Sequence, residues 1–278
     1  MEISKVIKND HFNLRQIALS GQCFRFRETD DGDFLIVSGD KAVYARQISP
    51  NEIGLSCCES EYEKYWQNYF DYPESKEDPY GKIENLIMDS QDDYLKSAFD
   101  FGSGMRILRQ DLWESIVCFI ISQNNNIKRI KGSIDKICAK AGIKVSEGIY
   151  KIPEADEVDP GFFLDKGLGL GYRDVFLSNL FAYTKDNSGW YEELKGLKYE
   201  DAMKRLTDIN GIGPKVANCI CLFGLHHIDA FPIDTHIKQI LNTHYPKGFD
   251  FERYKGVAGI IQQYMFYYKI SQGKKGEQ

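Results

Sequence analysis

Lys215 and Asp234 are the two residues whose types and spacing best suit covalent chemistry. Lys215 follows Gly-Ile-Gly-Pro at 211–214, and Asp234 follows Phe-Pro-Ile at 231–233, 19 residues downstream of the lysine. A neutral amine attacks an electrophilic carbon, and a carboxylate stabilises positive charge that develops beside it. Presented beside a segment that binds a phosphate backbone, the two groups indicate covalent chemistry on DNA.

The segment around Lys215 predicts a helix, a tight hairpin and a second helix. Apolar residues recur at helical spacing over 199–209, and the glycines of 210–213 then permit a turn that other residues disfavour. A proline such as Pro214 suits the first position of a new helix, which puts Lys215 at the second. The amides of such a hairpin bind a phosphate without reading a base. The residues expected to contact DNA here are Gly211, Gly213 and Val216.

Asp234 is expected to be held at the start of a helix. The pair Phe231-Pro232 interrupts the chain, and a helix is predicted over 235–242. Because Asp is a favoured N-cap residue, the helix that it caps fixes the direction of its carboxylate.

Composition sets the size class and leaves the partner open. The chain has 278 residues, 42% of them hydrophobic, so it can bury a large core and is expected to form two domains. A net charge of −6 and an isoelectric point near 5.5 do not indicate a nucleic-acid-binding protein. Local clusters of cations must then attract DNA, although each cation alone is typical of a solvated surface. The candidates are Lys128, Arg129, Lys131, Lys136, Lys204, Arg205 and Lys215.

The seven cysteines have neither the spacing of a metal site nor that of a disulfide framework, which favours a reducing compartment. The longest apolar run, 116–121, is too short to span a bilayer, and the first residues lack the core of a signal peptide. We expect a soluble monomer in the cytoplasm, nucleoid-associated in a prokaryote or nuclear in a eukaryote. Its chemistry needs no metal or cofactor.

The order of the predicted elements indicates an α+β protein. Strand-like segments separated by turn-forming runs fill the first third, and helical patterns follow over 61–70 and from Lys82 onward. We therefore expect an antiparallel β-sheet domain with helices over 1–100, packed on a mostly helical body over 101–278. The C-terminal helix is expected to return to the first domain. The predicted strands are 22–27, 34–37, 42–48 and 53–57.

These motifs resemble those of the helix-hairpin-helix (HhH-GPD) DNA glycosylase superfamily. Its hairpin is followed by a Gly/Pro-rich loop closed by an Asp, which matches the hairpin at about 200–223 and the loop 230–236. A Lys at the position of Lys215 marks the bifunctional members, which also cleave abasic DNA. The run Lys-Val-Ala-Asn-Cys-Ile-Cys at 215–221 is similar to 8-oxoguanine DNA glycosylases of the OGG type, and their architecture matches nearly the whole chain. The four-cysteine cluster of endonuclease III and the adenine glycosylases is missing from the sequence, so no iron–sulfur cofactor is implied.

The resemblance implies a pocket for an extruded base. The run Ser-Gly-Gln-Cys-Phe-Arg around Gly21 resembles the motif whose Gly carbonyl faces the lesion, where 8-oxoguanine carries an N7 hydrogen that guanine lacks. Cys219 and Phe266 match the residues that sandwich the base, and Gln262 matches the residue that bonds its Watson–Crick edge. His236 matches a position near the 5′ phosphate of the flipped nucleotide. From the residues alone, Gly21 could end a helix, the Gln262–Phe266 pair could be amphipathic packing, and His236 could be a hydrogen-bonded helix residue.

A base swung out of the duplex leaves a gap and an orphaned partner. The run Asn-Asn-Asn-Ile-Lys-Arg that begins at Asn124 resembles the family's loop that contacts the orphaned cytosine, which implies this role for Asn124 and Arg129. The run Gly-Tyr-Arg resembles the loop that wedges a ring into the duplex, which implies a wedge at Tyr172 and a second cytosine contact at Arg173. Tyr172 could instead be a surface turn residue. The two arginines together predict a preference for cytosine opposite the lesion.

The expected function is base-excision repair on double-stranded DNA containing oxidised guanine. Lys215 would displace the base and nick the strand through a Schiff base, while Asp234 stabilises the sugar cation. One alternative is a glycosylase of the same superfamily for another oxidised or alkylated base, although the alkyladenine enzymes normally lack the lysine. The other is a catalytically silent DNA-binding protein. The family's hairpin carbonyls, here those of Thr207, Ile209 and Ile212, can also hold a structural cation.

Overall fold

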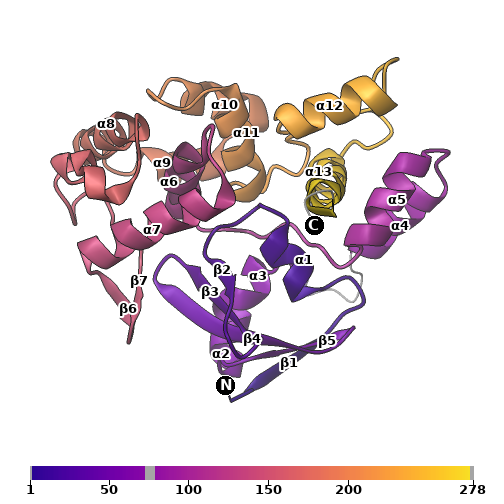
Figure 1. Ribbon diagram of the computed structural model, residues 1–278, viewed down its shortest axis with the longest axis horizontal. Coiled ribbons are helices and arrows are strands. Elements are labelled where there is room, and N and C mark those ends of the chain that lie inside the picture. Colours follow the sequence, from indigo (N-terminus) through magenta and orange to yellow (C-terminus); the bar gives the residue numbers. More distant parts are fainter. Residues whose placement is uncertain (1, 73–78, 276–278) are drawn as a thin grey trace.

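The N-terminal region is a five-stranded antiparallel sheet in the computed structural model, which describes residues 2–72 and 79–275. The strand order is β1-β5-β4-β3-β2, so the strands from β2 to β5 are sequential neighbours and β1 adds at one edge. This confirms the expected antiparallel sheet (Figure 1). The strands are β1 (Lys5–Lys8), β2 (Phe26–Glu28), β3 (Phe34–Ser38), β4 (Lys41–Ser49) and β5 (Glu52–Leu55).

One face of this sheet is buried because apolar residues occupy alternate positions along each strand. Phe34 pairs with Ala45, and Ala45 pairs in turn with Leu55, which gives a buried row across three strands. The row belongs to a hydrophobic core shared with α1 (Leu14–Leu19) and with Trp66 from the helical segment after the sheet. That segment comprises α2 (Glu59–Glu61), the π-helical η1 (Tyr62–Trp66) and α3 (Gln67–Tyr69), close to the helix predicted over 61–70.

The rest of the described chain forms a larger helical body around α6 (Leu112–Ser122), which is buried from Leu112 to Ile121. Its other long helices are α4 (Pro79–Met88), α5 (Asp93–Gly102), α7 (Ile127–Ala141), α8 (Arg173–Asp186), α10 (Tyr199–Thr207), α11 (Pro214–Phe223), α12 (Thr235–His244) and α13 (Ala258–Lys275). Its short elements are β6 (Lys144–Ser146), β7 (Ile149–Tyr150), η2 (Pro160–Leu164), η3 (Lys166–Leu168), α9 (Trp190–Glu193) and η4 (Leu194–Gly196). None of the helices within residues 2–72 and 79–275 combines the length and the apolar character that crossing a membrane requires.

The helix α13 packs on both α5 and α12, and Figure 1 shows it below α12 and beside α5. From its buried side, Gln263 Nε2 donates to the carbonyl of Ser20 at 2.7 Å, which ties the helix to the turn that follows α1. The apolar residues of α4 and α5 belong to the core of the helical body. The division of the chain at residue 100 stays a prediction.

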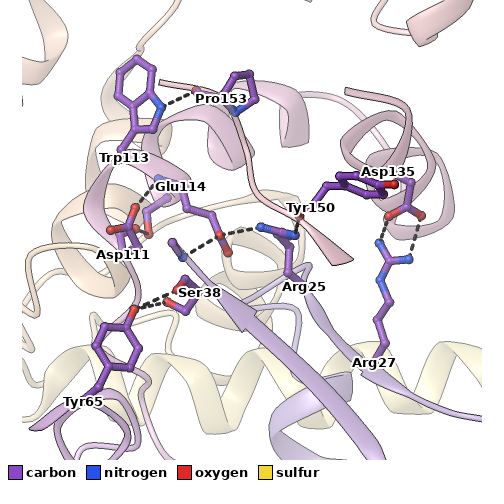
Figure 2. A network of polar contacts seen from close by, with 12 residues as sticks. Arg25, Arg27, Ser38, Tyr65, Asp111, Trp113, Glu114, Asp135, Tyr150 and Pro153 are labelled. Atoms are coloured by element: carbon purple, nitrogen blue, oxygen red, sulfur yellow. Dashed lines mark hydrogen bonds and ion pairs between the residues drawn. The ribbon is translucent and has the colours of Figure 1, made fainter. Parts of the chain in front are cut away.

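A buried polar network joins the sheet region to the helical body (Figure 2). Arg25 Nη1 donates to Glu114 Oε2 at 3.1 Å, and its Nη2 donates to the carbonyl of Tyr150. Burial raises the pKa of Glu114 to about 7, although the charge of Arg25 acts in the opposite direction. At the edge of the same junction, Arg27 pairs with Asp135 of α7. The junction thus encloses an ionisable pair that is cut off from water.

One local prediction was wrong, and two elements were missed. The strand predicted over 22–27 begins only at Phe26, because residues 22–25 run through a buried turn instead. The strand β1 was not predicted, since Lys-Val-Ile-Lys has only two apolar residues and its pairing with β5 decides its conformation. The small hairpin of β6 and β7 was not predicted either, because both strands are too short to show a pattern.

Candidate active site

A cavity of about 700 Å³ opens where α1, α6, α7, α11 and α13 meet the start of α12. Both residues predicted to be catalytic and all five residues predicted to bind the flipped nucleotide line this cavity. They are Lys215, Asp234, Gly21, Cys219, Gln262, Phe266 and His236. Residues from position 21 to position 266 are therefore brought to one place by the fold.

Lys215 extends from the first turn of α11, as the sequence predicted. Pro214 starts the helix after Gly213, so Lys215 is its second residue, and the side chain is exposed. Cys219 lies one turn further along the same face and is 4% exposed. Burial raises the pKa of the Cys219 thiol, whereas the charge of Lys215 and a hydrogen bond from it act to lower that pKa. The thiol therefore stays neutral and forms an apolar wall beside the amine.

Asp234 caps α12, again as predicted. Its Oδ1 accepts a hydrogen bond from the backbone N–H of Ile237 at 2.8 Å, which is the usual bond of an N-cap. The side chain is half-buried at the cavity wall. Its charge acts to raise the pKa of the Cys219 thiol, whereas the charge of Lys215 acts to lower that pKa. The carboxylate and the amine therefore both influence this thiol.

Gln262 lines the cavity and has an acceptor that is unpartnered among the described residues. The side chain is 4% exposed, and its Nε2 donates to the carbonyl of Pro232 at 3.1 Å. Its Oε1 is buried and has no hydrogen-bond partner within the described part of the chain. Buried polar atoms are nearly always hydrogen-bonded, so this oxygen is suited to accept a bond from a ligand.

Gly21 is held in a conformation that side chains rarely adopt. Its φ is +78°, and a Cβ at this position would lie 3.1 Å from Cε1 of Phe266. The ring of Phe266 in turn packs edge-on to His236, with ring centroids 5.9 Å apart. Glycine therefore lets the turn approach the face of the ring that lines the cavity.

The Gly21 turn is fixed on both sides by glutamines. The side chain of Gln22 is fully buried, and it donates to the carbonyl of Arg106 at 2.8 Å and accepts from the N–H of Leu108 at 2.8 Å. Gln263 holds the Ser20 carbonyl on the other side. Sequence reasoning missed Gln263, although its position next to Gln262 on a buried helix was the available signal.

Three phenylalanines form an apolar floor that was not predicted. Phe24, Phe119 and Phe223 line the cavity and are each buried. The rings of Phe119 and Phe223 are stacked with centroids 5.4 Å apart, and Phe24 packs edge-on to Phe119 at 5.8 Å. Lys128 and Lys131 of α7 also line the cavity, so two of the predicted cations accompany Lys215 there.

The residues expected to meet the opposite base lie outside this cavity. Asn124 is exposed with φ +44°, Arg129 is exposed on the first turn of α7, and Tyr172 is 52% exposed. Gln123, which was not predicted, links this loop to the hairpin by donating to the carbonyl of Gly211 at 2.8 Å. Its place in the run before Asn124 was the signal in the sequence.

Arg173 is buried beside the Asn124 loop, and its contact with cytosine stays a prediction. Arg173 is 4% exposed, and its Nε donates to the carbonyl of Gln123 at 2.7 Å while its Nη2 donates to that of Asn124 at 2.7 Å. The tight turn at Asn124 points these carbonyls inward, and the guanidinium satisfies them. Arg173 therefore supports the Asn124 loop in this structure.

The hairpin between α10 and α11 has the predicted form. Gly211 has φ +90°, and a Cβ there would lie 2.6 Å from Phe176, whereas Gly213 faces open space. The side chain of Val216 is 3% exposed, so only its backbone N–H, in the first turn of α11, is available for a phosphate. Residues 207–213 line a hollow of about 410 Å³ together with Gln123. The described residues contain no cluster of three His, Cys, Asp or Glu suited to a metal ion, and the cation site at the hairpin carbonyls stays a prediction.

Comparisons with known proteins agree with this geometry. The family described as 8-oxoguanine DNA glycosylase, N-terminal domain, matches residues 5–116. An N-glycosylase/DNA lyase of Saccharomyces cerevisiae is 34% identical over a 158-residue alignment that covers 51% of this chain and 42% of the relative. A probable N-glycosylase/DNA lyase of Methanothermobacter thermautotrophicus is 29% identical over 220 residues, covering 66% of this chain and 69% of the relative. The match covers about two fifths of the length of the curated relatives from yeast and Arabidopsis thaliana (42% and 41%).

Solved structures extend the likeness to the whole chain. A 3-methyladenine DNA glycosylase of Archaeoglobus fulgidus has a TM-score of 0.73 at 19% identity over 97% of this chain and 98% of its own, so the fold is that of a DNA glycosylase. The 8-oxoguanine glycosylase/lyase of Clostridium acetobutylicum, solved with double-stranded DNA containing cytosine opposite 8-oxoguanine, has a TM-score of 0.86 at 30% identity. That match covers 98% of this chain and 100% of the other. The chain therefore belongs to the OGG-type 8-oxoguanine DNA glycosylase family of the HhH-GPD superfamily.

Proposed function

We propose that this protein removes 8-oxoguanine from double-stranded DNA and then nicks the abasic strand. The observation that carries this proposal is the one cavity lined by Lys215, Asp234 and all five residues expected to bind the flipped nucleotide. An amine, a carboxylate and a base-sized apolar pocket are what displacement of a base from its sugar requires. The chain would act as a monomer, in the cell compartment that holds the DNA.

Recognition of the base would use three parts of the cavity. Gln262 Oε1, which is buried and unpartnered, would accept a hydrogen bond from the Watson–Crick edge of guanine, whose N1 and exocyclic nitrogen are donors. The carbonyl of Gly21 would accept the N7 hydrogen of the oxidised base, and a normal guanine would instead meet it with a lone pair. Cys219 and Phe266 would cover the two faces of the ring.

Base removal would proceed by displacement at the sugar. As the N-glycosidic bond lengthens, positive charge grows on the sugar ring, and the Asp234 carboxylate stabilises that charge. The neutral amine of Lys215 forms a bond to C1′, and the bond to the base breaks with its electron pair moving onto the base, which is then protonated. Opening of the ring gives a Schiff base between Nζ and C1′.

Strand nicking would follow from the same intermediate. The Schiff base withdraws electrons, so a proton is lost from C2′ and the 3′ phosphate leaves with the C3′–O bonding pair. Water then releases Lys215 from the sugar fragment. Each step uses only DNA, water and groups of this chain.

DNA would be held by the hairpin and by the loops beside the cavity. The backbone amides near Gly211, Gly213 and Val216 would bind a phosphate, and Lys128 and Arg129 would add local positive charge. Tyr172, exposed at the surface, would fill the gap left by the extruded base. Asn124 and Arg129 would then contact the orphaned cytosine, while Arg173 holds the loop that carries Asn124.

Borohydride trapping tests the chemistry. Reduction of the Schiff base should leave a stable covalent complex between the protein and a duplex containing 8-oxoguanine. Lys215→Gln should abolish this complex and lower strand nicking by roughly three orders of magnitude or more. Lys247→Gln, which changes an exposed lysine after α12, is the matched control and should trap like the wild type. A complex that persists in Lys215→Gln would reject Lys215 as the nucleophile.

A panel of duplexes separates the remaining alternatives. With 8-oxoguanine placed opposite each of the four bases, release should be fastest opposite cytosine; equal rates would reject the assigned roles of Asn124 and Arg129. Faster release of another oxidised or alkylated base would favour a different glycosylase of the superfamily. Failure to nick even an abasic duplex would favour a catalytically silent DNA-binding protein.

A further inference from the structure

Outside the base pocket, two residues in a rare backbone conformation face one another. Asp71 has φ +50° and His226 has φ +56°, although neither is a glycine. Residues other than glycine stay in the left-handed region only where the surrounding contacts hold their backbone in that conformation. His226 Nε2 lies 3.2 Å from Asp71 Oδ1, and the two side chains are 11% and 13% exposed. Both backbones are therefore arranged so that these side chains meet.

The Asp71 side of this contact is rigid. Arg109 Nε donates to Oδ1 at 2.9 Å, the hydroxyl of Tyr80 donates to Oδ2 at 3.1 Å, and Arg106 Nη2 donates to the backbone carbonyl at 2.6 Å. Burial acts to raise the pKa of Asp71, but the hydrogen bond and charge of His226, with Arg109 and Arg106, bring it below its ordinary value. Asp71 is thus a fixed carboxylate at the end of the N-terminal region.

The His226 side belongs to the loop that connects the two proposed catalytic residues. This loop, 224–233, begins where α11 ends and leads directly to Asp234. The N–H of His227 donates to the carbonyl of Cys221 at 2.8 Å, and the carbonyl of Ile228 accepts from Gly259 at 2.7 Å. His226 Nδ1 is buried with no hydrogen-bond partner among the described residues, so the contact with Asp71 sets the orientation of the ring.

We propose that Asp71 and His226 form a positioning pair for the catalytic carboxylate. By holding the start of the 224–233 loop against the N-terminal region, the pair sets the place of Asp234 relative to Lys215. Neither residue lines the base cavity, so the pair acts through the loop. The inference rests on the proposed function, because it assigns the pair to base removal, the step in which the sugar cation forms beside Asp234.

Two substitutions separate the contact from the backbone strain. His226→Asn keeps a residue type that tolerates the left-handed region but is too short to reach Asp71. His226→Gln extends an amide N–H to about the reach of Nε2. Because a displacement of about 1 Å can cost a hundredfold in rate, we expect a smaller shift in His226→Asn to slow single-turnover base removal about tenfold. His226→Gln should recover to within about threefold of the wild type.

Two further readouts distinguish positioning from a general loss of structure. Nicking of a preformed abasic duplex needs Lys215 but forms no sugar cation, so it should change less than about twofold in His226→Asn. Amide hydrogen exchange over 224–234 should be faster in His226→Asn than in the wild type, without DNA present. His227→Asn, at a neighbour whose ring packs edge-on to Tyr199, is the matched control and should leave all three measurements unchanged.

These experiments test the Asp71–His226 pair separately from the proposed function. Wild-type base release, measured first, tests the function, whereas the exchange rates test the pair whatever the substrate. Exchange over 224–234 that is unchanged in His226→Asn would overturn the pair. So would an equal loss of base removal and abasic nicking, or a loss in His226→Gln as large as that in His226→Asn.

Discussion

The base pocket and the junction around Arg25 are both built from polar and charged side chains, but they differ in how much bonding capacity they leave open. In the pocket, Lys215 is exposed and Gln262 Oε1 has no partner within the described residues. In the junction, Glu114 and Arg25 are buried and bonded to each other, and Arg25 also binds a backbone carbonyl. Figure 2 shows how closely the junction groups face one another.

Because of this difference, the pocket is suited to bind and react with a ligand, whereas the junction is suited to hold the structure together. An open acceptor or amine costs some stability in the free protein, but it can bind and attack a ligand. A closed pair does neither, and it is destabilising chiefly when one partner is removed, because the other charge is then left buried. We therefore expect substitutions in the pocket to change rates and substitutions in the junction to change stability.

The largest expected effect is on stability, at the junction. Arg25→Met removes the cation and leaves Glu114 buried without its partner, which should lower the free energy of unfolding by about 3–5 kcal/mol. Urea unfolding measures this change. Base removal per trapped active site should stay within about threefold of the wild type. A large loss of rate with little loss of stability would erase the distinction between the two regions.

The next effect is on rate, in the pocket. Asp234→Asn removes the charge that is proposed to stabilise the sugar cation, and single-turnover base removal should fall by about 100- to 1000-fold. Asn caps helices as well as Asp does, so the free energy of unfolding should change by less than about 1 kcal/mol. Single-turnover kinetics and urea unfolding on the same preparation check both values. If the free energy of unfolding falls by much more than this, the main role of Asp234 is structural, like that of the junction residues.

The smallest of these effects depends on pH. Because the folded-state pKa of Glu114 is raised from 4.5 to about 7, its contribution to stability is fully present below about pH 4.5 and is lost as the pH rises through about 7. The wild-type free energy of unfolding should lose about 3 kcal/mol across this window from this group. Glu114→Gln, which cannot ionise, should lack that loss. Glu28→Gln, at an exposed carboxylate paired with Arg15, is the control and should lose stability with rising pH as the wild type does. If the free energy of unfolding depends on pH equally in the wild type and in both variants, the assignment to Glu114 is contradicted.

The features of the site that the sequence predicted are those that depend on residues close together in the chain. Pro214 fits the first position of a helix, Asp234 fits an N-cap, and Gly21 fits a turn with positive φ, so each is evident within a few residues. The resemblance to a known family then related these local features to one another. For the same reason the sheet and the helix-hairpin-helix segment were predicted correctly.

The parts that were missed depend on contacts between distant segments. Arg173 has the same local sequence whether it points to solvent or to the carbonyl of Gln123, and only the packed structure decides between them. Gln263 and His226 have partners at Ser20 and Asp71, more than a hundred residues away in the chain. A periodicity can mark such a residue as buried, but it does not identify the distant partner.

The position of α13 in the chain has a consequence for synthesis. Gln262 and Phe266 line the cavity, and Gln263 holds the turn that presents Gly21. A nascent chain that has reached residue 257 therefore already carries Lys215 and Asp234 but lacks Gln262, Phe266 and the side chain that anchors the Gly21 turn. The residues proposed to act on the sugar thus precede Gln262 and Phe266 in the chain, and the proposed recognition of the base requires α13 to dock against the Gly21 turn.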